Sequence, residues 1–139
     1  MRKDYYDIAC DDMLFMKDIW HLKHDNHIAV NAQQIAEKVL KSIAERVCSS
    51  NPTILNSHNL RYIYREIKRA GVILSLDIKE LAFLTDFYFV RYPGEDYIEV
   101  DEEVCEECVA VMKNVVHAVN GYRKQHNLYI CEELSEKNK

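Results

Sequence analysis

The chain has 139 residues, 48% of them hydrophobic, and a formal net charge of −5, values typical of one soluble globular domain with a buried core. Only three Gly and two Pro occur, which disfavours an all-β fold, and no apolar run reaches the roughly 18 residues that a membrane span requires. The net negative charge disfavours nucleic-acid binding over the whole surface. The acidic N-terminal stretch MRKDYYDIACDD lacks the apolar core of a secretion signal, so we expect a cytoplasmic protein.

Apolar residues at helical spacing predict five helices. In chain order they cover about residues 3–23, residues 26–48, a segment from Ser57 as N-cap to Gly71, a segment from Asp77 to the stretch 89–97, and a segment from Asp101 to about residue 126. We therefore expect an all-α, up-down bundle of about five helices, four long and one short. The last helix carries two adjacent apolar stripes, which is more than one neighbour needs, and this predicts a homodimer.

Residues 1–126 are expected to form the single domain, and residues 127–139 a polar tail that frays. The five cysteines are odd in number and scattered, which indicates reduced thiols. Cys105 and Cys108 form a CxxC on the apolar stripes of the last helix, so we expect buried thiols there. His21, His24 and His27 have a spacing that can bind zinc, but they lie at a helix end, and we expect no metal and no cofactor.

Three stretches, in this order, resemble one known family. They are AVNAQQIAEKVLKSI (Ala29–Ile43), SHNLRYI (Ser57–Ile63) and FVRYPGE (Phe89–Glu95). They are similar to the second-helix signature, the start of the third helix and the end of the fourth helix of the HEPN domain, the higher eukaryotes and prokaryotes nucleotide-binding domain. The stretch IACDDM near the N-terminus resembles the first helix of that family, so the resemblance covers about residues 3–125.

The resemblance implies a helical, commonly dimeric domain that associates with nucleotides or RNA. It also implies frequent pairing with a minimal nucleotidyltransferase, often as a toxin–antitoxin couple. Many members are metal-independent ribonucleases that use an Arg followed four to six residues later by a His. This chain keeps Arg91, but the residues four to seven positions on, where the His is expected, are Glu95, Asp96, Tyr97 and Ile98. We therefore expect the usual Arg/His dyad to be absent, and we assign no catalytic residue. Arg91 and His58 are the two residues that remain as candidates for a catalytic role.

Arg91 is either a phosphate contact or a helix-end cation that pairs with the following acids, and Tyr92 is either a ligand contact or part of the helix stop. A polar stripe formed by Asn31, Gln34, Lys38 and Lys41 faces either solvent, which we expect, or a nucleotide. Arg61 and Arg65, with Lys68 and Arg69, form a basic stripe that either follows phosphates or, as we expect in a net-acidic chain, is not a nucleic-acid face. His58 has either a catalytic role or a local role at a helix start.

The sequence thus leaves three hypotheses. The first is a regulatory module that binds nucleotide or RNA, or that pairs with a nucleotidyltransferase, and that lacks the ribonuclease dyad. The second is a divergent ribonuclease in which Arg91 and a His from elsewhere in the dimer, such as His58, act together. The third is a structural helical adaptor that binds no nucleotide.

Overall fold

The computed structural model describes residues 4–48, 52–89 and 100–135, and within these ranges every regular element is a helix. The elements are α1 (Tyr5–Ile19), η1 (Trp20–Leu22), α2 (Asp25–Val47), α3 (Pro52–Leu55), α4 (Leu60–Arg69), α5 (Ile78–Thr85), η2 (Asp86–Phe89), α6 (Glu102–Gln125) and η3 (Glu132–Leu134), where η denotes a 3-10 helix. The predicted all-α fold is confirmed. No helix in these ranges is long and apolar enough to cross a membrane.

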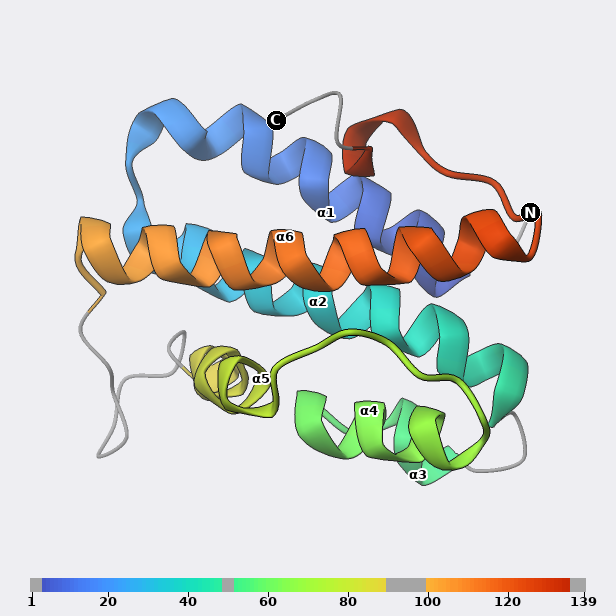
Figure 1. Ribbon diagram of the computed structural model, residues 1–139. Helices are drawn as coiled ribbons and strands as arrows, with labels where there is room; N and C mark the ends of the chain where they lie inside the picture. Colours follow the sequence, from blue (N-terminus) through green and yellow to red (C-terminus); the bar gives the residue numbers. More distant parts are fainter. Residues whose placement is uncertain (1–3, 49–51, 90–99, 136–139) are drawn as a thin grey trace.

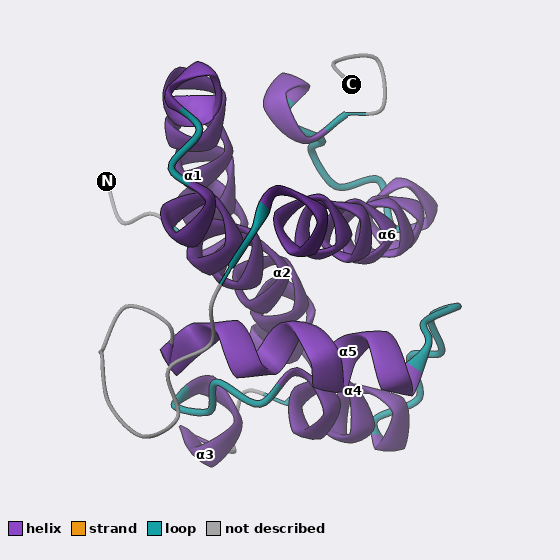
Figure 2. Cartoon of the chain, turned by 90° about the vertical axis from the view of Figure 1, so that its left-hand side faces the viewer, coloured by secondary structure: helices purple, strands orange, loops and turns teal. Residues whose placement is uncertain are grey.

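The three longest helices, α1, α2 and α6, lie alongside one another, and the shorter helices α3, α4 and α5 gather against one side of α2 (Figure 1). Seen from the end of the bundle, α2 occupies the middle, with α1 and α6 above it and the short helices below (Figure 2). The most extensive packing joins α2 to α6 and to α1, followed by its packing against α4. Because α2 has neighbours on several sides, some of its polar side chains are buried, and these need hydrogen-bond or charge partners within the protein.

The helix ends follow from local chemistry. Asp77 and Asp101 accept hydrogen bonds from the backbone N–H groups of Lys79 and Val104, at 2.8 Å in both cases. The predicted N-cap at Asp77 is confirmed, and Asp101, where the last helix was predicted to start, is an N-cap as well. At the end of α4, Gly71 has a φ of +101°, which a residue with a side chain rarely adopts. This conformation lets the N–H of Val72 donate to the carbonyl of Ile67 at 3.1 Å, which closes the helix.

Three predicted boundaries differ from the structure. Asn59, not Ser57, caps α4, because its side chain accepts from the N–H of Tyr62 whereas Ser57 accepts from Asn59 N–H. The segment 52–55, which lies between two predicted helices, forms the short helix α3, since Pro52 suits a first helical turn. The fourth predicted helix is regular only as far as Thr85 and continues as the tighter η2, so it is shorter than expected.

The segment after α6 does not fray within residues 127–135, contrary to our expectation. Cys131 and Leu134 are buried, and η3 packs on α1. Tyr6 binds this segment from α1, because its hydroxyl accepts from Cys131 N–H at 3.2 Å and donates to Asn120 at 2.9 Å. Arg123 donates to the carbonyl of Tyr129 at 2.8 Å. Although this segment is mostly polar, a few of its side chains are buried and attach it to α1.

A disulfide joins Cys10 on α1 to Cys131, so the expectation of five reduced thiols is wrong for this pair. Their separation of 121 residues in the sequence gave no indication that they meet. Cys105 and Cys108 are buried free thiols, as predicted. Burial, with neighbouring acids, raises the pKa of Cys105 to about 11, and burial next to Cys105 raises the pKa of Cys108 to about 12.

Candidate functional site

A cluster of buried polar side chains lies on one face of α2. Gln33, Glu37 and Lys41 follow at four-residue intervals and are at most 3% exposed. The ammonium of Lys41 donates to Glu37 Oε2 at 3.0 Å, and the amide of Gln33 donates to Glu37 Oε1 at 3.1 Å. The ammonium of Lys38 lies 3.6 Å from Glu37 Oε2 and donates to Gln34 at 2.9 Å. Glu37 is therefore the common acceptor at the centre of the cluster.

His58 and Tyr88 reach this cluster from two other parts of the chain. His58 lies just before α4, and its Nδ1 is 3.0 Å from Glu37 Oε1. The ring of Tyr88, in η2, stacks on the imidazole with centroids 3.8 Å apart and an interplanar angle of 13°. Gln33 also donates to the carbonyl of His58 at 3.3 Å. The imidazole is consequently fixed at one edge by a carboxylate and on one face by an aromatic ring.

The start of α4 is held against α5 by a further bond, which positions His58 relative to Tyr88. Thr85 accepts from the N–H of Leu60 at 3.0 Å and donates to the carbonyl of Leu81 at 2.8 Å. A threonine hydroxyl can do both at once because it carries one donor and two acceptor lone pairs. The end of α5 is thereby linked to the first turn of α4, two residues after His58.

The electrostatics of the cluster favour an ionised carboxylate. Burial raises the pKa of Glu37, but the charge of Lys41 and the hydrogen bonds from Gln33 and Lys41 outweigh burial, and the pKa is lowered overall. Burial lowers the pKa of Lys41, and the attraction of Glu37 opposes that shift. On α1, burial raises the pKa of Asp12, partly offset by Lys38. A buried ionised pair with shifted pKa values is a common property of functional sites.

The expectation that the polar stripe of α2 faces solvent is wrong for two of its members. Asn31 and Lys41 are buried, because α1 covers this side of α2. Asn31 donates to the carbonyl of Asp12 at 2.7 Å, and the Lys41 ammonium lies 5.7 Å from the ring centroid of Tyr5. The other two, Gln34 and Lys38, are partly exposed beside the cluster.

The remaining candidate residues lie apart from the cluster or outside the described residues. Arg61 and Arg65 are exposed on α4. The guanidinium of Arg65 lies 5.4 Å from the ring centroid of Tyr62 and 3.9 Å from a carboxylate oxygen of Glu66. Part of its positive charge is therefore balanced within the protein. Arg91 and Tyr92 fall in residues 90–99, which the structure does not describe. In sequence, Arg91 follows Tyr88 by three residues.

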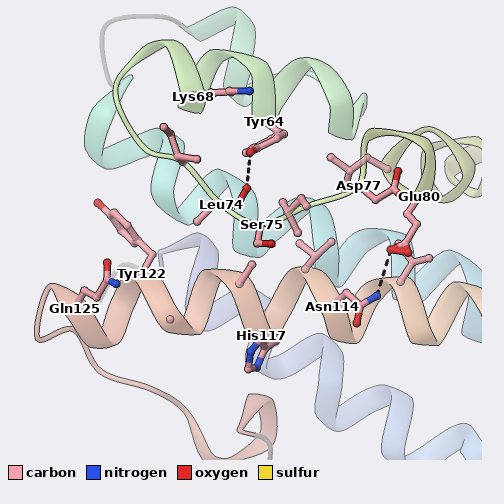
Figure 3. Close-up of a pocket in the computed structure, with 17 residues that line it drawn as sticks. Tyr64, Lys68, Leu74, Ser75, Asp77, Glu80, Asn114, His117, Tyr122 and Gln125 are labelled. Carbon is pink, nitrogen blue, oxygen red and sulfur yellow. Dashed lines mark hydrogen bonds between the residues drawn. The ribbon is translucent and has the colours of Figure 1, made fainter.

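A hollow lies between α6 and the segment that joins α4 to α5 (Figure 3). Its volume is about 980 Å³. Glu80 extends toward α6, where it accepts a hydrogen bond from Asn114 at 3.2 Å, and Tyr64 donates to the carbonyl of Leu74 at 2.6 Å (Figure 3). The charged groups at this hollow are spread along its length, whereas those of the α2 cluster converge on one carboxylate. We therefore place the candidate site at the cluster.

The described residues hold no group of three side chains that can bind a metal ion. His24 and His27 lie edge to face, with ring centroids 5.8 Å apart. The side chains that the structure brings together at the candidate site are one imidazole, one buried carboxylate and nearby lysine ammonium groups.

The architecture and this cluster define a helical domain in which a surface histidine is supported by a buried ion pair. The family model of the HEPN domain matches residues 3–122, and the chain therefore belongs to the HEPN domain family. This confirms the resemblance seen in the sequence and points to a function related to nucleotides or RNA. No curated protein and no solved structure matches the chain significantly.

Gln33 and Glu37 are site residues that the sequence reasoning missed. A signal for them was present, because both belong to the stretch AQQIAEK that carries the resemblance on α2. His58 belongs to the second such stretch, and Tyr88 immediately precedes the third. Two of the stretches that carry the resemblance, through Glu37 and His58, therefore meet beside Tyr88 in the fold.

Proposed function

We propose that this chain is a regulatory domain that binds RNA or a nucleotide on the surface around His58, Tyr88 and Lys38. The observation that supports it is that Glu37 and His58, from two of the family-like stretches, meet beside Tyr88. An imidazole edge and an aromatic face can contact a base or a sugar, and a lysine can neutralise a phosphate. Arg91, three residues beyond Tyr88, supplies a guanidinium for a second phosphate contact, with Tyr92 next to it.

The test is a binding titration by fluorescence anisotropy with a labelled oligoribonucleotide. His58→Ala and Arg91→Ala are expected to weaken binding several-fold each, by the loss of one contact. His21→Ala, on η1, is the matched control and is expected to bind like the wild type. Because phosphate contacts release counterions, the affinity should fall as salt rises. No binding of RNA, and no thermal shift with nucleotides, would leave the adaptor hypothesis.

A metal-independent ribonuclease is the second candidate, and one observation favours it. The usual His is missing after Arg91, but Glu37 holds Nδ1 of His58 at 3.0 Å, an arrangement that orients a histidine for proton transfer. In this candidate, Nε2 of His58 takes part in proton transfer and Arg91 stabilises phosphate charge. Cleavage of labelled RNA that disappears in both His58→Ala and Arg91→Ala would select this function over simple binding.

We further propose a homodimer and a minimal nucleotidyltransferase as the protein partner, in a toxin–antitoxin-type pair. The family resemblance supports both. The apolar stripes of α6 do not provide the dimer surface that we expected, because most of their residues are buried within the chain. Apolar side chains are instead exposed on α1 and η1, among them Phe15 and Trp20 at 52% and 48%. Light scattering on wild type and Phe15→Ser is the direct check of the dimer.

A further inference from the structure

The buried carboxylate fixes which nitrogen of His58 carries the proton. The carboxylate of Glu37 accepts hydrogen bonds from Gln33 and Lys41, and the ammonium of Lys38 lies 3.6 Å from it. A carboxylate in such surroundings accepts and does not donate. Nδ1 of His58, 3.0 Å from the same carboxylate, must therefore carry a hydrogen. In the neutral imidazole the lone pair is then on Nε2, which is a hydrogen-bond acceptor.

The acceptor nitrogen is directed away from the interior. Glu37 has 1% of its side chain exposed, whereas His58 has 42%. The Nδ1 edge of the ring points toward Glu37, which places Nε2 on the side of the ring away from the buried carboxylate. No described residue forms a hydrogen bond with Nε2. Stacking on Tyr88 at 3.8 Å keeps the ring from rotating, so the acceptor has a fixed direction.

We propose that His58, positioned by Glu37, selects ribose over deoxyribose because its Nε2 accepts a hydrogen bond from the 2′-hydroxyl of a bound ribonucleotide. This inference rests on the proposed function, since it assigns the sugar that the same surface recognises. The 2′-hydroxyl is the group by which a protein distinguishes RNA from DNA at a given position. A deoxyribonucleotide leaves Nε2 without its partner, and a 2′-O-methyl group has no hydrogen to donate.

The shared chemistry is a ribose next to a phosphate, which occurs both in RNA and in free nucleotides. The experiment therefore has two arms, both run at about pH 8. One arm compares an oligoribonucleotide with its 2′-deoxy and 2′-O-methyl forms. The other compares adenosine 5′-monophosphate with its 2′-deoxy form. If the natural ligand is RNA the preference should appear in the first arm, and if it is a free nucleotide it should appear in the second. In that arm the wild type is expected to bind the 2′-hydroxyl form with about three- to tenfold higher affinity, the effect of one hydrogen bond.

His58→Ala should bind the hydroxyl and deoxy forms equally, and the control His21→Ala should keep the preference. Equal binding by the wild type, or a preference that survives in His58→Ala, overturns the inference and leaves the proposed function intact. An absence of binding in both arms overturns both.

A second measurement tests the positioning role of Glu37 without any ligand. Nitrogen chemical shifts of the imidazole, measured by NMR at about pH 8, report which nitrogen is protonated. The expected result for His58 is a protonated Nδ1 and a bare Nε2 in the wild type, with a mixture of the two forms in Glu37→Gln, because an amide can either donate or accept. A protonated Nε2 in the wild type contradicts the inference.

Discussion

Replacing Lys41 by Met is the sharpest perturbation of the buried cluster. The change preserves much of the side-chain volume but removes the charge that lies 3.0 Å from Glu37. Glu37 then keeps its negative charge at 1% exposure with weaker compensation. Removing one partner of a buried ion pair costs about 3–5 kcal/mol. We expect a loss near the lower end, about 3 kcal/mol, because Gln33 and Lys38 remain beside the carboxylate.

For a chain of this length, each kcal/mol corresponds to a Tm change of about 3 °C, so Lys41→Met should melt about 10 °C below the wild type. Urea unfolding should show the same loss of free energy. Lys113→Met, on the exposed side of α6, is the matched control and should change stability by about 0.5 kcal/mol or less. A Lys41→Met loss no larger than that of the control would refute the view that this pair is a buried ion pair.

The difference in stability between the wild type and Lys41→Met is expected to depend on pH. The partners of Glu37 lower its pKa in the folded protein below its unfolded value of about 4.3. Its ion pair therefore stabilises the fold above about pH 4, and this contribution is lost as the pH falls through the lower folded value. The difference in stability between wild type and Lys41→Met should shrink below about pH 4. A difference that stays constant down to acid unfolding would assign the effect to packing instead of charge.

Three further predictions follow from the helix ends and the cysteines. Asp77→Ala and Asp101→Ala each remove an N-cap and should lower the free energy of unfolding by about 1 kcal/mol, as measured in urea, whereas Asp18→Ala on the exposed surface of α1 should not. Reduction of the disulfide, or Cys10→Ser with Cys131→Ser, should cost about 4 kcal/mol because the bond closes a long loop in the unfolded chain; equal stability of the oxidised and reduced forms would contradict the bond. At about pH 8 the thiols of Cys105 and Cys108, with pKa values of about 11 and about 12, should resist a thiol reagent in the native protein and react after unfolding; rapid native labelling would show that they are accessible.

The sequence predicted the helices well where local signals decide the structure. Asp77, Asp101 and Gly71 act through their own backbone neighbourhood, so their roles could be deduced from their type and position. The short helix α3 was missed because four residues give no periodic pattern. The continuation of α5 as a 3-10 helix was missed as well, because the last turn of a helix often tightens in this way without a separate signal in the sequence.

The candidate site was less predictable because burial depends on tertiary neighbours. Lys41 lies on the polar stripe predicted for α2, and a residue on such a stripe usually faces water. It is buried here because α1 covers this side of α2, which no pattern within α2 reveals. The pairing of His58 with Glu37 joins residues 21 apart in sequence, and the disulfide joins residues 121 apart. Contacts of this kind follow from the packing of helices, and a single sequence carries no direct signal for them.

The energetic cost of the Glu37 cluster is the strongest reason to connect it with function. A buried ion pair is often replaced by apolar residues without loss of stability, so the fold alone does not require Glu37 and Lys41. Burial of such a pair becomes useful when a neighbouring group needs a fixed orientation, and His58 is that neighbour. A histidine without the carboxylate would exchange its proton between both nitrogens and present no fixed acceptor. Gln33 supports the same interpretation, because it binds both Glu37 and the carbonyl of His58, so that one side chain holds the carboxylate and the histidine backbone together.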